Sequence, residues 1–251
     1  MPETNCCYFA KGEGCRFCSL ATLQNKARFS AQLVADAALC ALEHNSKYEL
    51  ALSGGTPDAP DKGANYFAEI AALVAKKKRM AISAELVPPD DNFYLDRLHD
   101  AGVTSVIMNI ELWDGRLRQM FCPGKARVPI ERYLQAIEYA AKVFGPGQVA
   151  SVLIAGLQGA EVLLEGAQAV IELGCIPTVI PFKPFDACAM AAFPKTNPED
   201  ILRIHREVSD ILIQKGLNPT LQKGCTGCGG CSLETVAFKL HIPTQHASHS
   251  D

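Results

Sequence analysis

Three cysteines near the start of the chain carry the most specific chemistry in the sequence. Cys7, Cys15 and Cys18 lie in the run CYFAKGEGCRFC, in which Phe17 precedes the last cysteine. Three thiolates can hold three irons of a [4Fe–4S] cluster and leave the fourth iron open. Cys6 is the alternative to Cys7 as the first ligand. Zinc is the alternative metal, although zinc usually has a fourth protein ligand close by. The spacing therefore predicts an iron–sulfur centre with a free coordination position.

A second cysteine set lies near the other end of the chain. Cys225, Cys228 and Cys231 form a Cys-x2-Cys-x2-Cys run on glycine-rich turns. This run opens the ligand pattern of bacterial ferredoxins, but the Cys-Pro that completes that pattern is absent. We expect an auxiliary [4Fe–4S] cluster here, with a structural zinc site as the alternative. The candidates for a fourth ligand are Cys6, Cys188, Ser232 and an exogenous group.

The composition favours a globular, metal-binding protein. The chain has 251 residues, 48% hydrophobic content and a formal net charge of −3, which gives no indication of nucleic-acid or membrane binding. No apolar run is long enough to span a bilayer, and the first residues lack the parts of a signal peptide. Eleven cysteines without a secretion signal favour metal ligands over disulfides, and hence a cytoplasmic protein.

Apolar periodicity predicts strands that alternate with helices. The expected strands are 48–52, 80–86, 103–112, 149–155 and 176–182, and the expected helices are 31–42, 66–75, 92–100, 129–144, 160–173 and 198–215. Such alternation predicts βαβ units and a parallel sheet, here an α/β fold with a partial (β/α) barrel of about five strands. Residues 1–216 would form the barrel, and 217–251 a C-terminal segment with the second cysteine set. Functional side chains are expected after the carboxyl ends of the strands.

Four segments at or after these strands are suited to cofactor binding. They are SGGTP at 53–57, SAELVPP at 83–89, NIE at 109–111 and SVLIAGLQ at 151–158. With the first cysteine set, they resemble the motifs of radical S-adenosylmethionine enzymes of the biotin synthase and tyrosine lyase branch, over about 6–215. The family usually has Cys-x3-Cys-x2-Cys, whereas this chain has seven residues in the first gap, as in some variant members.

The resemblance implies where S-adenosylmethionine would bind. Phe17 would flank the adenine. Ile154, Gly156 and Gln158 would also lie at the adenine, although Ser151 and Gln158 stand where the family has Gly and Glu. The turn implied for the methionine end consists of Gly54, Gly55, Thr56 and Pro57. Thr56 replaces the usual Glu there, so backbone groups would make that contact.

Polar side chains complete the implied site. Asn109 and Glu111 end the third strand, where the family binds the ribose, and Glu85 lies in a Glu-x-x-Pro segment like that of tyrosine lyase-like members. The candidates to pair with the cofactor carboxylate are Lys125, Arg127 and Arg132. Family members also have a strand directly before the cluster loop, but only six residues precede Cys7. We therefore expect that strand to be missing, or another chain to cover that edge of the barrel.

The resemblance also implies a reaction. A reduced cluster would donate one electron to the sulfonium, giving methionine and a 5′-deoxyadenosyl radical that abstracts hydrogen from an unreactive carbon. Sulfur insertion of the lipoyl or biotin synthase kind is the first hypothesis, with this chain resembling a subunit of two-component lipoyl synthases. The rivals are a radical lyase, a dehydrogenase or a C–C bond-forming enzyme, and a non-catalytic Fe–S carrier. The expected partners are a small-molecule or carrier-bound substrate, ferredoxin or flavodoxin, and a partner subunit.

Overall fold

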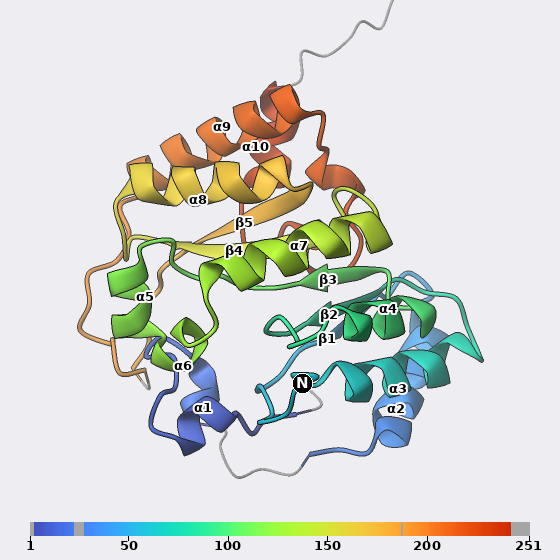
Figure 1. The fold of residues 1–251 in the computed structure, drawn as a ribbon. Coiled ribbons are helices and arrows are strands. Elements are labelled where there is room, and N and C mark those ends of the chain that lie inside the picture. The colour runs from blue at the N-terminus through green and yellow to red at the C-terminus, as the bar shows by residue number, and fades with distance from the viewer. Residues whose placement is uncertain (1–2, 23–27, 187, 242–251) are drawn as a thin grey trace, which may run out of the picture.

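Five parallel strands form one open sheet in the order β1-β2-β3-β4-β5 (Figure 1). The computed structural model describes residues 3–22, 28–186 and 188–241. The strands are β1 (Leu50–Leu52), β2 (Ile82–Glu85), β3 (Ser105–Ile107), β4 (Val149–Ala155) and β5 (Cys175–Pro181). This arrangement confirms the predicted partial barrel with five parallel strands. Across the described ranges, the helices are too short or too polar to pass through a membrane.

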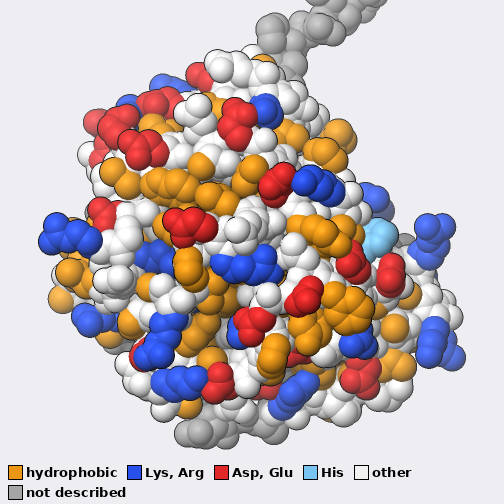
Figure 2. Space-filling model, in the orientation of Figure 1, with side chains coloured by type: hydrophobic (Ala, Val, Ile, Leu, Met, Phe, Trp, Pro, Cys, Tyr) orange, Lys and Arg blue, Asp and Glu red, His pale blue; other side chains and the backbone are white. Residues whose placement is uncertain are grey.

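The helices between the strands pack on one face of the sheet (Figure 1). They are α3 (Ala64–Ala75), α4 (Phe93–Asp100), α7 (Ile130–Phe144) and α8 (Ala160–Glu172), with α2 (Ala31–His44) before β1 and α9 (Pro198–Lys215) after β5. Alanine-rich and amphipathic faces of these helices join the outward side chains of the strands in the main hydrophobic core. On the outer face of these helices, acidic and basic side chains are interspersed (Figure 2).

Several short elements were not predicted from the sequence. They are α1 (Cys7–Ala10), α5 (Gly115–Phe121), α6 (Pro123–Ala126), α10 (Glu234–His241), and the 3₁₀ turns η1 (Ser19–Thr22), η2 (Pro219–Leu221) and η3 (Cys225–Cys228). The carboxylate of Asp114 caps α5 by accepting from the N–H groups of Arg116 and Leu117 at 2.8 and 2.9 Å. These elements are too short for a helical period to show in the sequence.

The third strand is shorter than predicted. Regular pairing stops at Ile107, and the chain rejoins the sheet only through an isolated bridge between Glu111 and Leu153. Glu111 has a φ of +71°, a left-handed conformation that costs a non-glycine residue about 1–2 kcal/mol. The chain therefore turns sharply at the residue predicted to bind the cofactor.

The two edges of the sheet differ. At β5, the carboxylate of Glu234 accepts a hydrogen bond from the N–H of Val179 at 2.5 Å, so α10 covers part of this edge. Beside β1, Glu3 makes a single parallel bridge to Gly54. Among the described residues, this bridge is all that pairs with β1 on that side, where family members have a full strand and where we expected the strand to be missing.

The C-terminal segment after α9 crosses the inner face of the sheet. Ser105 donates to the carbonyl of Lys223 at 2.9 Å, and Ser83 accepts from the N–H of Cys225 at 3.3 Å. The N–H of Gly224 donates to the carboxylate of Glu49 at 2.8 Å. These contacts place the second cysteine set inside the open side of the barrel. The predicted division between 216 and 217 falls at the end of α9, and it stays a prediction that the two parts are separate domains.

Candidate active site

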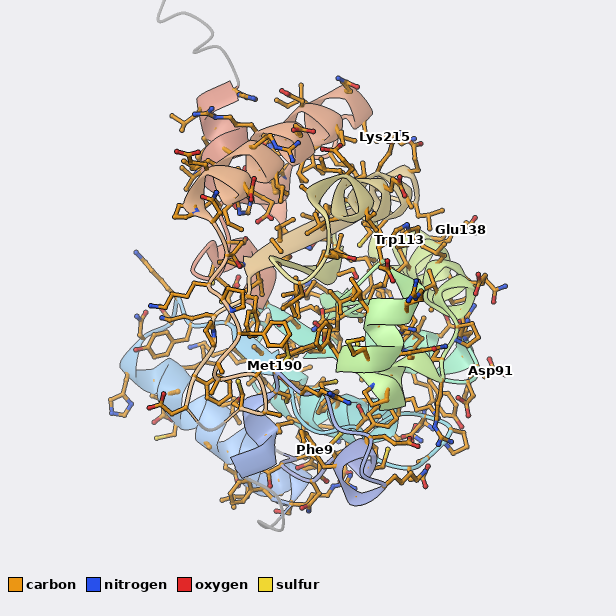
Figure 3. All side chains as sticks on the ribbon, turned by 90° about the vertical axis from the view of Figure 1, so that its left-hand side faces the viewer. Phe9, Asp91, Trp113, Glu138, Met190 and Lys215 are labelled. Carbon is orange, nitrogen blue, oxygen red and sulfur yellow. The ribbon has the colours of Figure 1, made fainter. Side chains whose placement is uncertain are left out.

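A cavity of about 490 Å³ opens at the inner face of the sheet and is bordered by both cysteine sets. Its lining comes from the first cysteine loop, the strands, the segment after β5 and the second cysteine loop: Phe17, Cys18, Ser19, Glu85, Ile107, Asn109, Glu111, Val152, Ile154, Thr178, Ile180, Pro181, Phe182, Lys183, Cys225, Gly229, Gly230, Cys231 and Ser232. Figure 3 looks onto the end of the barrel where the strands finish. The cavity thus lies where a parallel sheet presents its functional residues.

Register within the sheet explains which strand residues face the cavity. Glu85 lies beside Ile107, Val152 beside Thr178, and Ile154 beside Ile180. Because side chains alternate between faces of a strand, these neighbours share the inner face while residues between them enter the core under the helices.

The first cysteine loop is fastened to α5 and α6. The N–H of Arg16 donates to the carbonyl of Phe121 at 2.8 Å, and the N–H of Gly124 donates to Glu13 at 3.0 Å. A Cβ at Gly124 would collide with the ring of Tyr8, so glycine permits α1 to pack directly on α6. Figure 1 shows α1 and α6 as neighbours.

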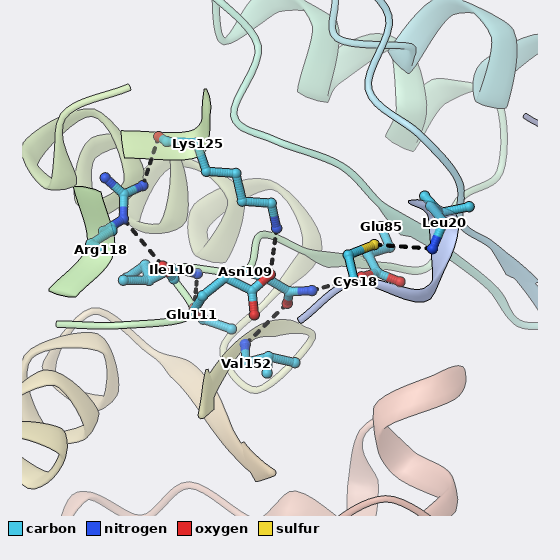
Figure 4. Close-up of polar contacts among 10 residues, drawn as sticks. Cys18, Leu20, Glu85, Asn109, Ile110, Glu111, Arg118, Lys125 and Val152 are labelled. Carbon is cyan, nitrogen blue, oxygen red and sulfur yellow. Dashed lines mark hydrogen bonds and ion pairs between the residues drawn. The ribbon is translucent and has the colours of Figure 1, made fainter. Parts of the chain in front are cut away.

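Cys15 and Cys18 lie together at the inner end of this loop. A hydrogen bond with Cys122 and then burial raise the pKa of the Cys15 thiol, whereas the Lys125 ammonium acts in the opposite direction. Burial raises the pKa of Cys18 to about 11. The Cys18 sulfur accepts a hydrogen bond from the N–H of Leu20 at 3.4 Å (Figure 4). Such N–H···S bonds favour the thiolate that an iron cluster requires.

Cys7 has different neighbours. Its N–H donates to the carbonyl of Thr56 at 2.8 Å, which ties it to the turn after β1. Burial raises the pKa of the Cys7 thiol, and the charged groups that act on it are Cys6, Asp58, Lys11 and Lys62. The choice between Cys6 and Cys7 as the first ligand therefore stays a prediction.

A buried ion pair lies beside the cavity, which Glu111 lines. The ammonium of Lys125 lies 2.5 Å from the carboxylate of Glu111 (Figure 4). Burial disfavours the charge on both partners and raises the pKa of Glu111, but the carboxylate of Glu111 outweighs burial at Lys125 and raises the pKa of Lys125 above its ordinary value. Lys125 is thus held as a cation by Glu111 beside the first cysteine set. It is the candidate cation that the structure brings to the site.

Arg118 and Ser151 fix the backbone around this ion pair, and the sequence did not indicate the role of either. Arg118 is 3% exposed and donates to the carbonyls of Ile110, Val128 and Lys125 at 3.2, 3.0 and 3.0 Å. The hydroxyl of Ser151 accepts from the N–H of Ile110 at 3.2 Å. The Ser that replaces the family's Gly therefore fixes the backbone next to Glu111.

A second carboxylate lies farther along the cavity. The amide of Asn109 donates to Glu85 at 2.6 Å, and its oxygen accepts from the N–H of Val152 at 3.0 Å (Figure 4). Both side chains line the cavity, as does Glu111. The structure thus brings these three predicted polar residues together, with Phe17 and Ile154 as apolar neighbours in the second hydrophobic cluster.

Other predicted residues do not line the cavity. A Cβ at Gly54 or Gly55 would collide with the backbone of Glu3 or Asn5, and the N–H of Gly55 donates to Glu3 at 3.0 Å. Thr56 and Pro57 belong to the same turn. The glycines thus admit the segment that leads to the first cysteine set, and the cofactor contact predicted for this turn stays a prediction.

The remaining predicted positions have structural contacts. Gly156 makes room for Thr196, whose hydroxyl donates to the carbonyls of Ala155 and Phe182. The oxygen of Gln158 accepts from the N–H groups of Trp113 and Asp114. Arg127 is exposed and pairs with Glu13, and Arg132 donates to Pro89 and Asn92.

The second cysteine set lies across the cavity from these groups. Cys225 and Cys231 line the cavity, and the sulfur of Cys228 accepts the N–H of Gly230 at 3.4 Å, as Cys18 accepts that of Leu20. Burial raises the pKa of the Cys225 thiol, with further contributions from Cys228 and Glu85. Ser232 borders the same cavity, whereas Cys188 is buried in the second hydrophobic cluster.

The donor chemistry of both sets fits iron–sulfur clusters. Each set offers three thiols, a backbone N–H directed at a sulfur, and a face open to the cavity. Within the described part of the chain, no three His, Cys, Asp or Glu side chains already lie close enough together to hold a metal ion. Near the first set, the hydroxyl of Tyr133 is buried without a hydrogen-bond partner.

The model of the Radical SAM superfamily matches residues 4–163, which is more than half of the chain. The chain belongs to the radical SAM superfamily. The resemblance in the first cysteine loop and the strand ends is therefore confirmed at the level of the superfamily. A [4Fe–4S] cluster and S-adenosylmethionine are the cofactors that this membership implies.

The similar proteins have longer chains than this one. A bacteriochlorophyllide c C-7(1)-hydroxylase of Chlorobaculum limnaeum is 28% identical over 228 residues, covering 81% of this chain and 56% of the relative. Methylornithine synthase (PylB) has a TM-score of 0.67 at 16% identity, covering 94% of this chain and 67% of that one. HydG, a maturase of the [FeFe]-hydrogenase, has a TM-score of 0.65 at 14% identity, covering 84% and 48%.

These relatives differ in their named chemistries. The solved structures support the fold, and the named chemistries do not single out the biotin synthase branch or sulfur insertion. The chain spans just over half the length of the curated relative.

Proposed function

We propose that this radical SAM protein cleaves S-adenosylmethionine beside Cys15 and Cys18 and activates a C–H bond of a substrate held between the two cysteine sets. The observation that carries the proposal is one cavity bordered by Cys18, by the strand-end acids, and by Cys225 and Cys231. When bound, a reduced cluster at these cysteines would supply the one electron that cleaves the sulfonium of S-adenosylmethionine.

The residues of the cavity would bind and orient the cofactor. Lys125 is a buried cation suited to the cofactor carboxylate, and Glu111 is an acceptor for the ribose hydroxyls. Phe17 and Ile154 would enclose the adenine between apolar surfaces. Cys7 is proposed as the third thiol ligand, with Cys6 as the alternative.

The second cysteine set is proposed to hold an auxiliary [4Fe–4S] cluster that faces the substrate. Because Cys225 and Cys231 line the cavity, sulfur insertion from this cluster is one outcome that the geometry supports. Hydroxylation is the second candidate, supported by the name of the curated relative. Loss of cluster sulfide during one turnover would distinguish sulfur insertion from a lyase, a dehydrogenase or a hydroxylase.

The decisive test of the common step needs no substrate. The chain, reconstituted anaerobically with iron and sulfide, should form 5′-deoxyadenosine from S-adenosylmethionine when dithionite is added. An Fe–S carrier would bind iron without forming this product, so iron content with no 5′-deoxyadenosine would refute the proposal. A small-molecule or carrier-bound substrate, a ferredoxin or flavodoxin reductant and a partner subunit remain proposals of the same kind.

A further inference from the structure

One charged side chain of the cavity has no part in the proposed chemistry. Lys183 follows β5 and lines the cavity. The two carboxylates of the cavity are already paired, Glu85 with Asn109 and Glu111 with Lys125. Within the described ranges, Lys183 has no hydrogen-bond or ion-pair partner. It is thus a free cation at the edge of this cavity.

The backbone fixes where this lysine starts. The N–H of Phe182 donates to the carbonyl of Ala155 at 2.8 Å, and the carbonyl of Phe182 accepts from the hydroxyl of Thr196 at 3.2 Å. Pro184 follows Lys183 and restricts it to an extended conformation. The backbone at Lys183 is therefore fixed, unlike that of a lysine on a flexible loop.

Apolar residues line much of the cavity that Lys183 borders. Besides Phe17 and Ile154, which we assign to the adenine, they are Ile107, Val152, Ile180, Pro181 and Phe182. A concave apolar surface with few polar groups binds apolar molecules, and the polar groups fix their orientation. A cation without a partner at such a surface favours a ligand that carries its own negative charge.

We propose that the substrate of this cavity is an apolar molecule with one anionic group, a carboxylate or a phosphate, and that Lys183 pairs with that group. The inference rests on the proposed function, because it names the substrate class for the same cavity. It assigns Lys183 to substrate recognition and leaves the cofactor to Lys125 and Glu111.

Two fluorescent probes test this on the iron-reconstituted full chain. 8-Anilinonaphthalene-1-sulfonate is apolar and anionic, and N-phenyl-1-naphthylamine is its uncharged counterpart. Lys183→Ala should raise the dissociation constant of the anionic probe about five- to tenfold and leave the neutral probe unchanged. Lys183→Arg should retain binding. Lys195→Ala, at an exposed lysine after the same strand but outside the cavity lining, is the matched control and should change neither probe.

A fourth variant tests whether the probes bind in the cavity. Val152→Trp fills part of it and should weaken both probes. Competition by decanoate and by decyl phosphate against the anionic probe then separates a carboxylate from a phosphate. Equal binding of the anionic probe to wild type and Lys183→Ala would overturn the proposal, and so would binding of both probes that Val152→Trp leaves unchanged. Formation of 5′-deoxyadenosine by the wild type is scored separately, so failure of the proposed function and failure of this inference remain distinguishable.

Discussion

The two cysteine sets offer the same ligands in different surroundings. In the first set, Cys15 is 9% exposed and lies near Lys125. Cys7 and Cys18 are half-buried. In the second set, Cys225, Cys228 and Cys231 are all exposed, and the charge outside the set that acts on Cys225 is the carboxylate of Glu85. The first set is therefore the more buried and lies beside a cation, and the second is open and lies beside an anion.

The sets are also held by different means. The first loop packs on α5 and α6, which are themselves held by Arg118, so its position depends on the barrel. The second loop is held by hydrogen bonds between its backbone and the side chains of Ser105, which donates, and of Ser83 and Glu49, which accept. A shielded site beside a cation suits electron transfer to a charged cofactor, whereas an open, hydrogen-bonded loop suits a cluster that a substrate can reach.

The largest expected difference between the sets is in cofactor cleavage. Cys15→Ala or Cys18→Ala should abolish 5′-deoxyadenosine formation, because the cluster that donates the electron loses a ligand. Replacing Cys225, Cys228 and Cys231 together should leave cleavage intact and lower the iron content from about eight to about four atoms per chain. Cys40→Ala, at an exposed cysteine on α2, is the control.

Two results would break this part of the comparison. Stoichiometric zinc with iron fixed at four in the wild type would mean that the second set holds no iron cluster. Cleavage that survives Cys7→Ala but not Cys6→Ala would move the first ligand by one residue. We expect the reverse.

A smaller effect is expected at the ion pair beside the first set. Glu111→Ala should weaken S-adenosylmethionine binding roughly ten- to a hundredfold, since a hydrogen bond to a charged group contributes about 1.5–3 kcal/mol. Glu111→Gly should weaken binding equally but be more stable than the Ala variant by about 1 kcal/mol, because glycine accepts the positive φ. Titration of the reduced-cluster EPR signal with cofactor gives the midpoint, and denaturant unfolding gives the stability. An unchanged midpoint with an intact cluster would remove Glu111 from the cofactor site.

The iron content of the second set should depend on how α10, which follows it, is attached to the barrel. Glu234 is 3% exposed and lies 3.2 Å from the imidazole of His205 as well as bonding Val179. Glu234→Ala leaves the buried N–H of Val179 without an acceptor, which costs about 1–3 kcal/mol. We expect iron at the second set to fall while 5′-deoxyadenosine formation persists. Parallel loss of both would show that α10 supports the whole barrel.

The smallest effect is expected at a single hydrogen bond that holds the second cysteine loop. Ser105→Ala removes one hydrogen bond to Lys223, which is worth about 1 kcal/mol. Iron release from the second set to a chelator should become several-fold faster, with release from the first set unchanged. Thr104→Ser, which keeps a hydroxyl at the neighbouring position, serves as the control. Equal release rates for Ser105→Ala and wild type would mean that this contact does not hold the loop.

Strand and helix positions followed closely from periodicity. β4 and α9 have the bounds predicted from the sequence, because long apolar or amphipathic runs are bordered there by glycine, proline or a cap such as Asn197. The break in the third strand could not be predicted, since the apolar run continues through Ile110 and Leu112 while the backbone turns at Glu111.

Strand alternation accounts for the direction of Glu85, which faces the cavity from β2. Asn109 and Glu111 also line the cavity, but they do so from the segment after β3, where the backbone leaves the strand. Gly156 and Gln158 do not line the cavity, and they contact residues that lie far away in the sequence. Lys183, which we propose for substrate recognition, was not predicted because no motif accompanies it, although Pro181 and Pro184 border the Phe182–Lys183 pair and mark a stiff segment.

The backbone conformation of Glu111 has a consequence for the evolution of sequences with this barrel. The side chain of Glu111 pairs with Lys125 and is proposed to bind the cofactor, whereas its backbone would be more stable with glycine. A lineage that gave up the reaction, and lost Lys125 with it, would therefore gain stability by drifting away from glutamate at this position. In a collection of sequences with this barrel, glutamate at the position equivalent to 111 would mark those still under selection for activity, and glycine would mark those that have kept the fold alone.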